Sequence, residues 1–305
     1  MRMRRGLFVA TVILLAGQAP ALAAGGVQEN PPSWGLDRID QHTGLDQAYH
    51  YASDAAGVTV YVIDTGVDMK HPDFGGRVAP GKDFLGNGTD TSDGNGHGTR
   101  IAGIAAGTGY GVAKAAQIIP VRVLDKDGGG ATEKIIAGID WVAQNAEQPA
   151  VAVLGIGGVA NEQLDAAVKR LAAVMPVAVP AGGESSDASG FSPGRVAEAL
   201  TVGAVDVGDK PAKTSNFGQS VDFYAPGVEI PAPLAGGTGS GALSGTSMAA
   251  AFAAGAAAVY RGLHPEASPA EVCDALVQAA TPDVVVDVPK GTANRLLYLA
   301  PPAGQ

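Results

Sequence analysis

The segment Val58-Thr59-Val60-Tyr61-Val62-Ile63-Asp64-Thr65-Gly66 decides the fold class, because a short apolar run leads directly into an acidic residue and a glycine turn. Comparable runs occupy 118–124, 151–154, 177–179 and 200–205, and their near-continuous hydrophobicity predicts strands covered on both faces. Between them, 101–106, 132–145 and 161–174 carry apolar residues at helical spacing. This alternation predicts an α/β fold with a mainly parallel central sheet flanked by helices.

The N-terminal segment 1–24 is typical of a secretory signal peptide. It contains Arg2, Arg4 and Arg5, an apolar run over 7–16, and small residues at Ala21 and Ala23. That apolar run is about half of the roughly 20 residues that a membrane-spanning helix needs. We therefore expect an exported mature chain over 25–305, which is long enough for a single large domain.

The charge balance argues against nucleic acid and anionic membranes as partners. The formal net charge is −10, and without the three arginines of segment 1–24 it becomes −13 (−10 − 3).

Cys273 is the only cysteine, so the chain cannot form an intramolecular disulfide. It lies in a predicted helix opened by the capping sequence Ser268-Pro269-Ala270-Glu271, where we expect a buried, inert thiol. The Pro/Gly-rich stretch 226–241 is predicted to be a surface loop.

Three polar residues lie where a parallel sheet forms sites. Asp64 follows a buried strand, His97 lies between glycines just before a helix, and Ser247 precedes a long Ala-rich helix that runs to about His264. Each has an ordinary explanation when taken alone: turn chemistry for the aspartate, a solvated loop for the histidine and a helix cap for the serine. Only the combination of the three residues points to one kind of chemistry.

The motifs around these residues resemble those of the subtilisin-like serine peptidases, in particular proteinase K-like members. The matching segments are Val62-Ile63-Asp64-Thr65-Gly66, His97-Gly98-Thr99 and Gly245-Thr246-Ser247-Met248-Ala249, in that order. The resemblance implies a three-layer subtilisin-like fold and a secreted endopeptidase that needs no cofactor for catalysis. The aspartate, histidine, serine order is that of subtilisin and differs from the orders in chymotrypsin and α/β-hydrolases. On this resemblance, Ser247 is the nucleophile, His97 the general base and Asp64 the group that orients His97.

The same resemblance implies how a polypeptide substrate would bind. An extended peptide would lie between Gly128-Gly129-Gly130 and Gly155-Ile156-Gly157 and add a strand to both edges, although these glycines are also explained by tight turns. The pocket for the residue before the cleaved bond corresponds to Ala181 and Gly182, which suggests a broad apolar preference. We expect a monomer that acts on extended polypeptides.

The chain departs from the family pattern around the active site. Gly183 stands where the family has an asparagine that donates a hydrogen bond to the oxyanion, and loss of that donor predicts slow turnover. Arg100 replaces a usual histidine, and we expect its side chain to point to solvent. Ala251 and Phe252 replace Pro-His in the Ser247 helix, and Gly155-Ile156 replaces Ser-Leu. The sequence also brings Trp34-Gly35-Leu36, where mature family members begin, close to the signal, which suggests that the family's inhibitory pro-domain is missing.

Two other functions are compatible with parts of the sequence. The stretch 155–160 fits a dinucleotide-binding glycine pattern, with Glu184 as a candidate ribose ligand, but such short patterns have many false positives. A catalytically impaired member that binds peptides would explain Gly183, Phe252 and the absent pro-domain. For metals, Asp222 resembles a structural calcium position of proteinase K-like enzymes, and a solvated acidic loop residue is the ordinary alternative.

Overall fold

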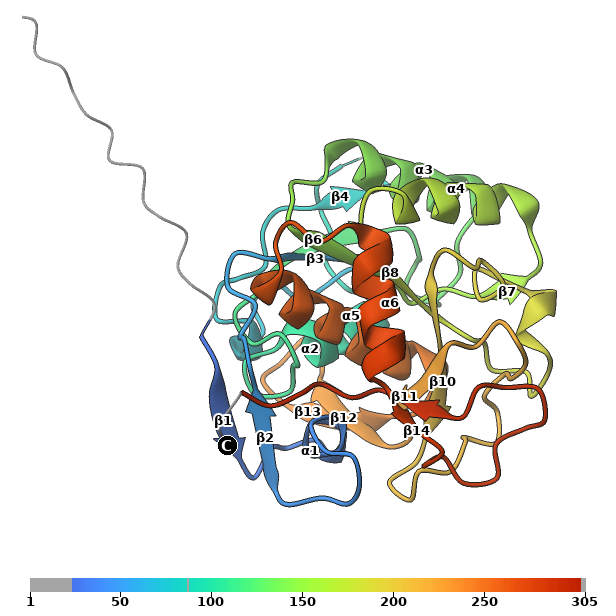
Figure 1. The fold of residues 1–305 in the computed structure, drawn as a ribbon. Helices are drawn as coiled ribbons and strands as arrows, with labels where there is room; N and C mark the ends of the chain where they lie inside the picture. The colour runs from blue at the N-terminus through green and yellow to red at the C-terminus, as the bar shows by residue number, and fades with distance from the viewer. Residues whose placement is uncertain (1–23, 87, 303–305) are drawn as a thin grey trace, which may run out of the picture.

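The computed structural model describes residues 24–86 and 88–302 and contains a large central sheet (Figure 1). In the described chain this sheet has nine strands in the order β14-β15-β11-β10-β8-β6-β3-β5-β4. All its neighbouring strands pair in parallel except β14 and β15, which are antiparallel. The predicted signal peptide lies outside the described residues, apart from Ala24. The predicted mainly parallel sheet is confirmed.

Strand bounds match the sequence prediction to within two residues at the centre of the sheet. The strands of this sheet are β3 (Thr59–Asp64), β4 (Lys82–Asp83), β5 (Gln117–Arg122), β6 (Ala150–Leu154), β8 (Val177–Pro180), β10 (Leu200–Val205), β11 (Phe223–Pro226), β14 (Thr281–Pro282) and β15 (Arg295–Leu296). Smaller antiparallel pairs are formed by β1 (Gly26–Glu29) with β2 (Ala48–Tyr51), by β7 (Gly158–Val159) with β9 (Phe191–Ser192), and by β12 (Ile230–Pro233) with β13 (Ser240–Leu243).

The helices cover both faces of the sheet and create the three layers. They are α1 (Trp34–Ile39), α2 (His97–Ala106), α3 (Thr132–Asn145), α4 (Glu162–Ala172), α5 (Thr246–Leu263) and α6 (Pro269–Ala279), with short 3₁₀ helices η1 (Pro72–Phe74) and η2 (Ala188–Gly190). Figure 1 shows α3 and α4 together on one side of the sheet, with α2, α5 and α6 on the other.

Alternation along β3 explains why two cores form. Val60 and Val62 join the core that contains α2 and α5, whereas Tyr61 and Ile63 join the core that contains α3 and α4. Successive side chains of a strand point to opposite faces of the sheet. A strand that is apolar at every position therefore packs against a hydrophobic core on each face. This is the physical basis of the near-continuous apolar runs seen in the sequence.

Local signals fix the helix ends. Asn161 caps α4 by accepting hydrogen bonds from the backbone N–H groups of Gln163 and Leu164, and Ser268 and Glu271 form the predicted capping box of α6.

Cys273 is partly buried against the core, and burial, with smaller contributions from nearby carboxylates, raises its pKa to about 12. Cys273 is thus less buried than predicted, and the raised pKa supports the prediction of an inert thiol, because only the thiolate is reactive.

The prediction of a surface loop over 226–241 is wrong for 230–233, which form β12, whereas 234–239 form a turn that is exposed over 236–239. Ile230 and Ala232 are fully buried, and β12 pairs with β13 through the register Ile230 with Leu243. Pro231 and Pro233 do not prevent this, because β12 has a strand partner on one side only and proline is tolerated at such edges.

Candidate active site

Asp64 and His97 form the buried half of the site. Asp64 is the last residue of β3 and has no exposed surface, and both its carboxylate oxygens lie 2.9 Å from His97 Nδ1. The backbone N–H of Thr65 donates a second hydrogen bond of 2.7 Å to Oδ1. The carboxylate therefore holds Nδ1 of His97 in its protonated form and leaves Nε2 as the basic nitrogen.

Asp93 anchors the start of the helix that carries His97. Its Oδ1 accepts hydrogen bonds from Thr65 Oγ1 and the backbone N–H of Gly96, and its Oδ2 accepts from the backbone and side chain of Thr99. Thr65 Oγ1 in turn accepts from the backbone N–H of Gly98. The turn after β3 and the first turn of α2 are thereby tied together, and this role of Asp93 was not predicted from the sequence.

Ser247 lies in the first turn of α5 and opens onto a pocket of about 340 Å³. Helix α5 packs against α2, the helix that begins at His97. Among the described residues, no hydrogen bond reaches Ser247 Oγ, so the contact expected with His97 Nε2 is not made in this structure. Such contacts are often long in free enzymes.

The pocket beside Ser247 is built mostly of backbone and small side chains, with Glu184 as its only ionisable lining residue. Glu184 Oε2 accepts hydrogen bonds from the backbone N–H of Gly183 (2.7 Å) and from Asn216 Nδ2 (2.8 Å). Asn216 is fully buried and also donates to the carbonyl of Ala181. The carboxylate is therefore held at the pocket wall, a feature that the sequence reading missed.

The predicted substrate glycines differ in how free their backbones are. Gly128 and Gly129 close a turn: Gly128 N–H donates to the Asp125 carbonyl, and Gly129 exchanges hydrogen bonds with Asp125. Gly155 N–H donates to the carbonyl of Ile63. The turn explanation thus accounts for Gly128 and Gly129, while no backbone hydrogen bond joins Gly130 or Gly157 to another described residue.

Comparison with known proteins places this geometry in a family. A model of the subtilase family of peptidases matches residues 55–297, which is well over half of the chain. The chain belongs to the subtilase family. It is 45% identical over 273 residues to an extracellular serine proteinase of Thermus sp. (strain Rt41A), an alignment that covers 88% of this chain and 67% of that protein.

A second relative and a solved structure support the same family. The chain is 44% identical over 281 residues to an alkaline serine exoprotease A of Vibrio alginolyticus, covering 92% of this chain and 52% of that protein. The crystal structure of a cold-adapted subtilisin-like serine proteinase superposes with a TM-score of 0.86 at 44% identity and covers 88% of this chain and 98% of that one. The subtilisin-like fold and the serine-type endopeptidase class are confirmed, and neither supports the dinucleotide-binding alternative.

Within this subtilase, Arg100 is half-buried, so the prediction that its side chain points to solvent holds only in part. Its Nη1 donates to the carbonyl of Gly96 at 3.3 Å, and its Nε is buried without a partner among the described residues. Burial is the largest influence on the His97 pKa and lowers it, as does Arg100 more weakly. The Asp64 carboxylate, with a smaller contribution from Asp93, outweighs both and leaves the His97 pKa raised.

The substitutions in the Ser247 helix have a structural outcome. Helix α5 runs without interruption from Thr246 to Leu263, as expected when alanine rather than proline occupies position 251. Phe252 is fully buried and packs on Gly35, where an added Cβ would lie 2.5 Å from its Cζ. Phe252 therefore belongs to the core between α1 and α5 and not to the substrate pocket.

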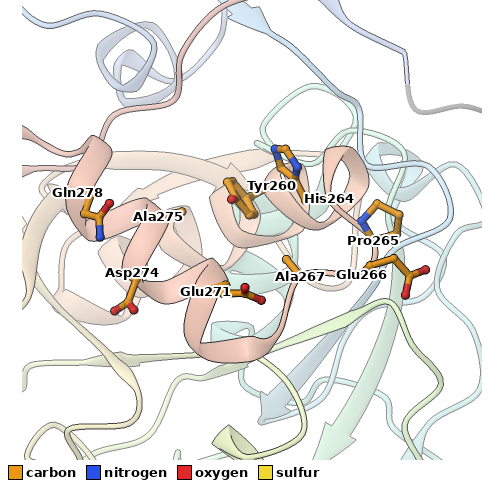
Figure 2. Close-up of a pocket in the computed structure, with 9 residues that line it drawn as sticks. All are labelled: Tyr260, His264, Pro265, Glu266, Ala267, Glu271, Asp274, Ala275 and Gln278. Carbon is orange, nitrogen blue, oxygen red and sulfur yellow. The ribbon is translucent and has the colours of Figure 1, made fainter.

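Two further features lie outside this site. A cavity of about 640 Å³ sits at the far end of α5 between Tyr260 and the start of α6 (Figure 2). Tyr260 is 13 positions after Ser247 (260 − 247), or about 20 Å along the helix, so this cavity lies well away from Ser247. Asp222 is partly buried; burial raises its pKa to about 6, and its Oδ2 accepts from the backbone N–H of Thr201. No group of three or more His, Cys, Asp or Glu side chains suited to a metal occurs within 24–86 and 88–302.

Proposed function

We propose that this subtilase is a secreted endopeptidase that hydrolyses peptide bonds through Asp64, His97 and Ser247. The observation that carries the proposal is the buried carboxylate of Asp64 against His97 Nδ1; Gly155 adjoins this pair, and Gly157, two residues further along the chain, lines the pocket at Ser247. His97 Nε2 takes the Ser247 proton as the hydroxyl attacks the carbonyl carbon, and returns it to the leaving amine. Water then repeats the sequence on the acyl-enzyme, while Asp64 stabilises the imidazolium.

Turnover is slow in this proposal because the oxyanion has one donor fewer. The backbone N–H of Ser247, at the start of α5, supplies a donor supported by the helix dipole. Gly183 has no side chain to supply the other. Loss of one such donor costs about 10²–10³ in kcat, which leaves a weak enzyme when typical accelerations are about 10⁶-fold or more.

The substrate lies extended and pairs with the backbones of Gly130 and Gly157, whose hydrogen-bonding groups are free of other described residues. The side chain before the cleaved bond enters the pocket at Ser247, where Ala181 and the backbone of Gly182 favour apolar groups. Glu184 adds one negative charge to that wall and so favours basic over acidic side chains.

Export and a monomeric state complete the proposal. The Thermus relative is named extracellular, and segment 1–24 has the composition of a signal peptide. Within the described residues, no helix has both the length and the apolar character required to cross a membrane. All residues of the site come from one chain, so a monomer is sufficient for activity, which light scattering of the active fraction tests.

Labelling by a fluorophosphonate tests the proposal directly. Folded protein is expected to be labelled at Ser247 and to cleave a casein-derived peptide, whereas Ser247→Ala does neither. A folded protein that binds peptides but is not labelled would support the alternative, a catalytically impaired peptide-binding member. Absence of both labelling and peptide binding would contradict both functions.

We also propose a structural calcium ion at Asp222, which catalysis does not require. A single carboxylate fits only if backbone carbonyls and water supply most of the six to eight oxygen ligands that calcium takes. A cation there would compensate a carboxylate that burial disfavours. Removal of calcium by a chelator is expected to lower the Tm of the wild type and to leave the Tm of Asp222→Asn unchanged; equal responses in both would contradict this site.

A further inference from the structure

A side chain at position 155 would collide with the catalytic carboxylate. Gly155 directly follows β6, and a Cβ built on it would lie 1.9 Å from Asp64 Oδ2 and 2.9 Å from His97 Cε1. Both distances are shorter than Cβ atoms show in real structures. The Asp64 carboxylate thus occupies the space that the side chain of residue 155 would need.

The other side of the carboxylate is bounded by glycine as well. A Cβ at Gly98 would lie 3.1 Å from Asp64 Oδ1 and 2.1 Å from the carbonyl of Gly66. Asp64 is fully buried, so its carboxylate has no open space into which it can turn. A group added at 155 therefore has to move the carboxylate or the end of β6.

We propose that Gly155 is a positioning residue, which by lacking a side chain lets Asp64 hold both oxygens 2.9 Å from His97 Nδ1. Serine, the usual family residue at this position, would displace the carboxylate in this chain. This inference deepens the proposed peptidase function and depends on it only for the kinetic readouts below.

The groups around His97 predict a second effect of moving the carboxylate, besides lost activity: a change in the His97 pKa. Asp64 and Asp93 favour the protonated imidazole, whereas burial and Arg100 disfavour it. When the Asp64 carboxylate moves away from Nδ1, burial becomes the dominant influence, and together with Arg100 it lowers the His97 pKa. Simple loosening of the fold would instead expose the imidazole and remove the effect of burial.

Gly155→Ala and Gly155→Ser are therefore expected to lower kcat by about 10²-fold, the cost of misplacing a reacting group by about 1 Å, with KM nearly unchanged. The acid limb of kcat/KM is expected to move to lower pH. NMR titration of His97 in the Ser247→Ala background, which cannot digest itself, is expected to show the same direction. Gly190→Ala is the matched control, because a Cβ there meets nothing within 4 Å.

A double-mutant cycle with Asp64→Ala covers the case in which the single variants do not fold. Removing the carboxylate removes the closer contact and leaves only the one of 2.9 Å to His97 Cε1, so Gly155→Ala is expected to lower the Tm strongly alone and much less in the Asp64→Ala background. An equal loss of Tm in both backgrounds would overturn the proposal, as would a Gly155→Ser enzyme with wild-type kcat and an unshifted His97 titration. If the wild type proves inactive, the proposed function fails, while the Tm cycle and the titration still decide this inference.

Discussion

On the proposed function, replacing Gly183 with asparagine is expected to raise kcat. A Cβ at Gly183 would meet nothing within 4 Å, so the local structure has room for a side chain. Its φ also lies outside the left-handed region, unlike that of Gly182 at +108°, so a non-glycine residue is tolerated. In subtilisin, one oxyanion-hole side-chain donor contributes about 10²–10³ in kcat, or about 2.7–4 kcal/mol, and we expect a gain of this order.

Glu184 can reduce that gain. Its Oε2 already accepts a hydrogen bond of 2.7 Å from the backbone N–H of Gly183, so a new amide at 183 has a charged acceptor close by. An asparagine amide that donates to this carboxylate is not available to the oxyanion. We therefore expect Gly183→Asn/Glu184→Ser to have a kcat at least as high as that of Gly183→Asn alone.

The assay is hydrolysis of a peptide p-nitroanilide, with active enzyme counted by fluorophosphonate titration. The gain is expected in kcat and not in KM, because the donor bonds the charge that develops in the transition state. Gly183→Leu is the control, since leucine has the same number and branching of side-chain heavy atoms as asparagine and no donor. If neither asparagine variant exceeds Gly183→Leu, the missing donor is not the main cause of slow turnover and the reasoning is refuted.

Three more outcomes can be measured. Arg100→Met removes a cation that lowers the His97 pKa, so the acid limb of kcat/KM should shift to higher pH; a shift to lower pH would contradict the assignment. Glu184→Gln should lower the ratio of kcat/KM for lysine over leucine before the cleaved bond by about two- to fivefold, the range for an exposed charge pair, and an unchanged ratio would remove Glu184 from the pocket. Burial lowers the pKa of Lys114 to about 8 from 10.5, so between these values the unfolded chain binds more protons and stability rises with pH. In the Ser247→Ala background, Lys114→Met should flatten the rise in Tm from pH 8 to 10, and a slope equal to that of the parent would disprove this.

The sheet could be predicted from the sequence because its central strands are buried on both faces. A strand such as β3 is then apolar at every position, and this pattern does not depend on knowing its neighbours. Edge elements carry no such pattern. In β12, Pro231 and Pro233 suggest a loop, and only the pairing with β13 and the burial of Ile230 make the segment a strand.

The site was predictable where one residue type performs one chemical role. Asp64 and His97 were identified from short motifs, and the structure joins them by hydrogen bonds. Asp93 and Glu184 were not, because their roles depend on which backbone N–H groups the fold brings to their carboxylates. Asp93 sits in an Asp-Gly-Asn-Gly turn, where an acidic residue is ordinary turn chemistry without the three-dimensional context.

Gly155 and Gly183 show why departures from a family pattern need coordinates before they can be interpreted. Both are glycines where the family has a polar side chain, and the sequence alone treats them as the same kind of loss. At Gly183 the space beside the Cα is open, so a substitution can supply the missing hydrogen-bond donor. At Gly155 the Asp64 carboxylate fills the space, so a side chain there is expected to disturb the hydrogen bonds between Asp64 and His97. Restoring the family residue is therefore expected to raise activity at 183 and lower it at 155, and this opposite sign follows from what occupies the space beside each Cα.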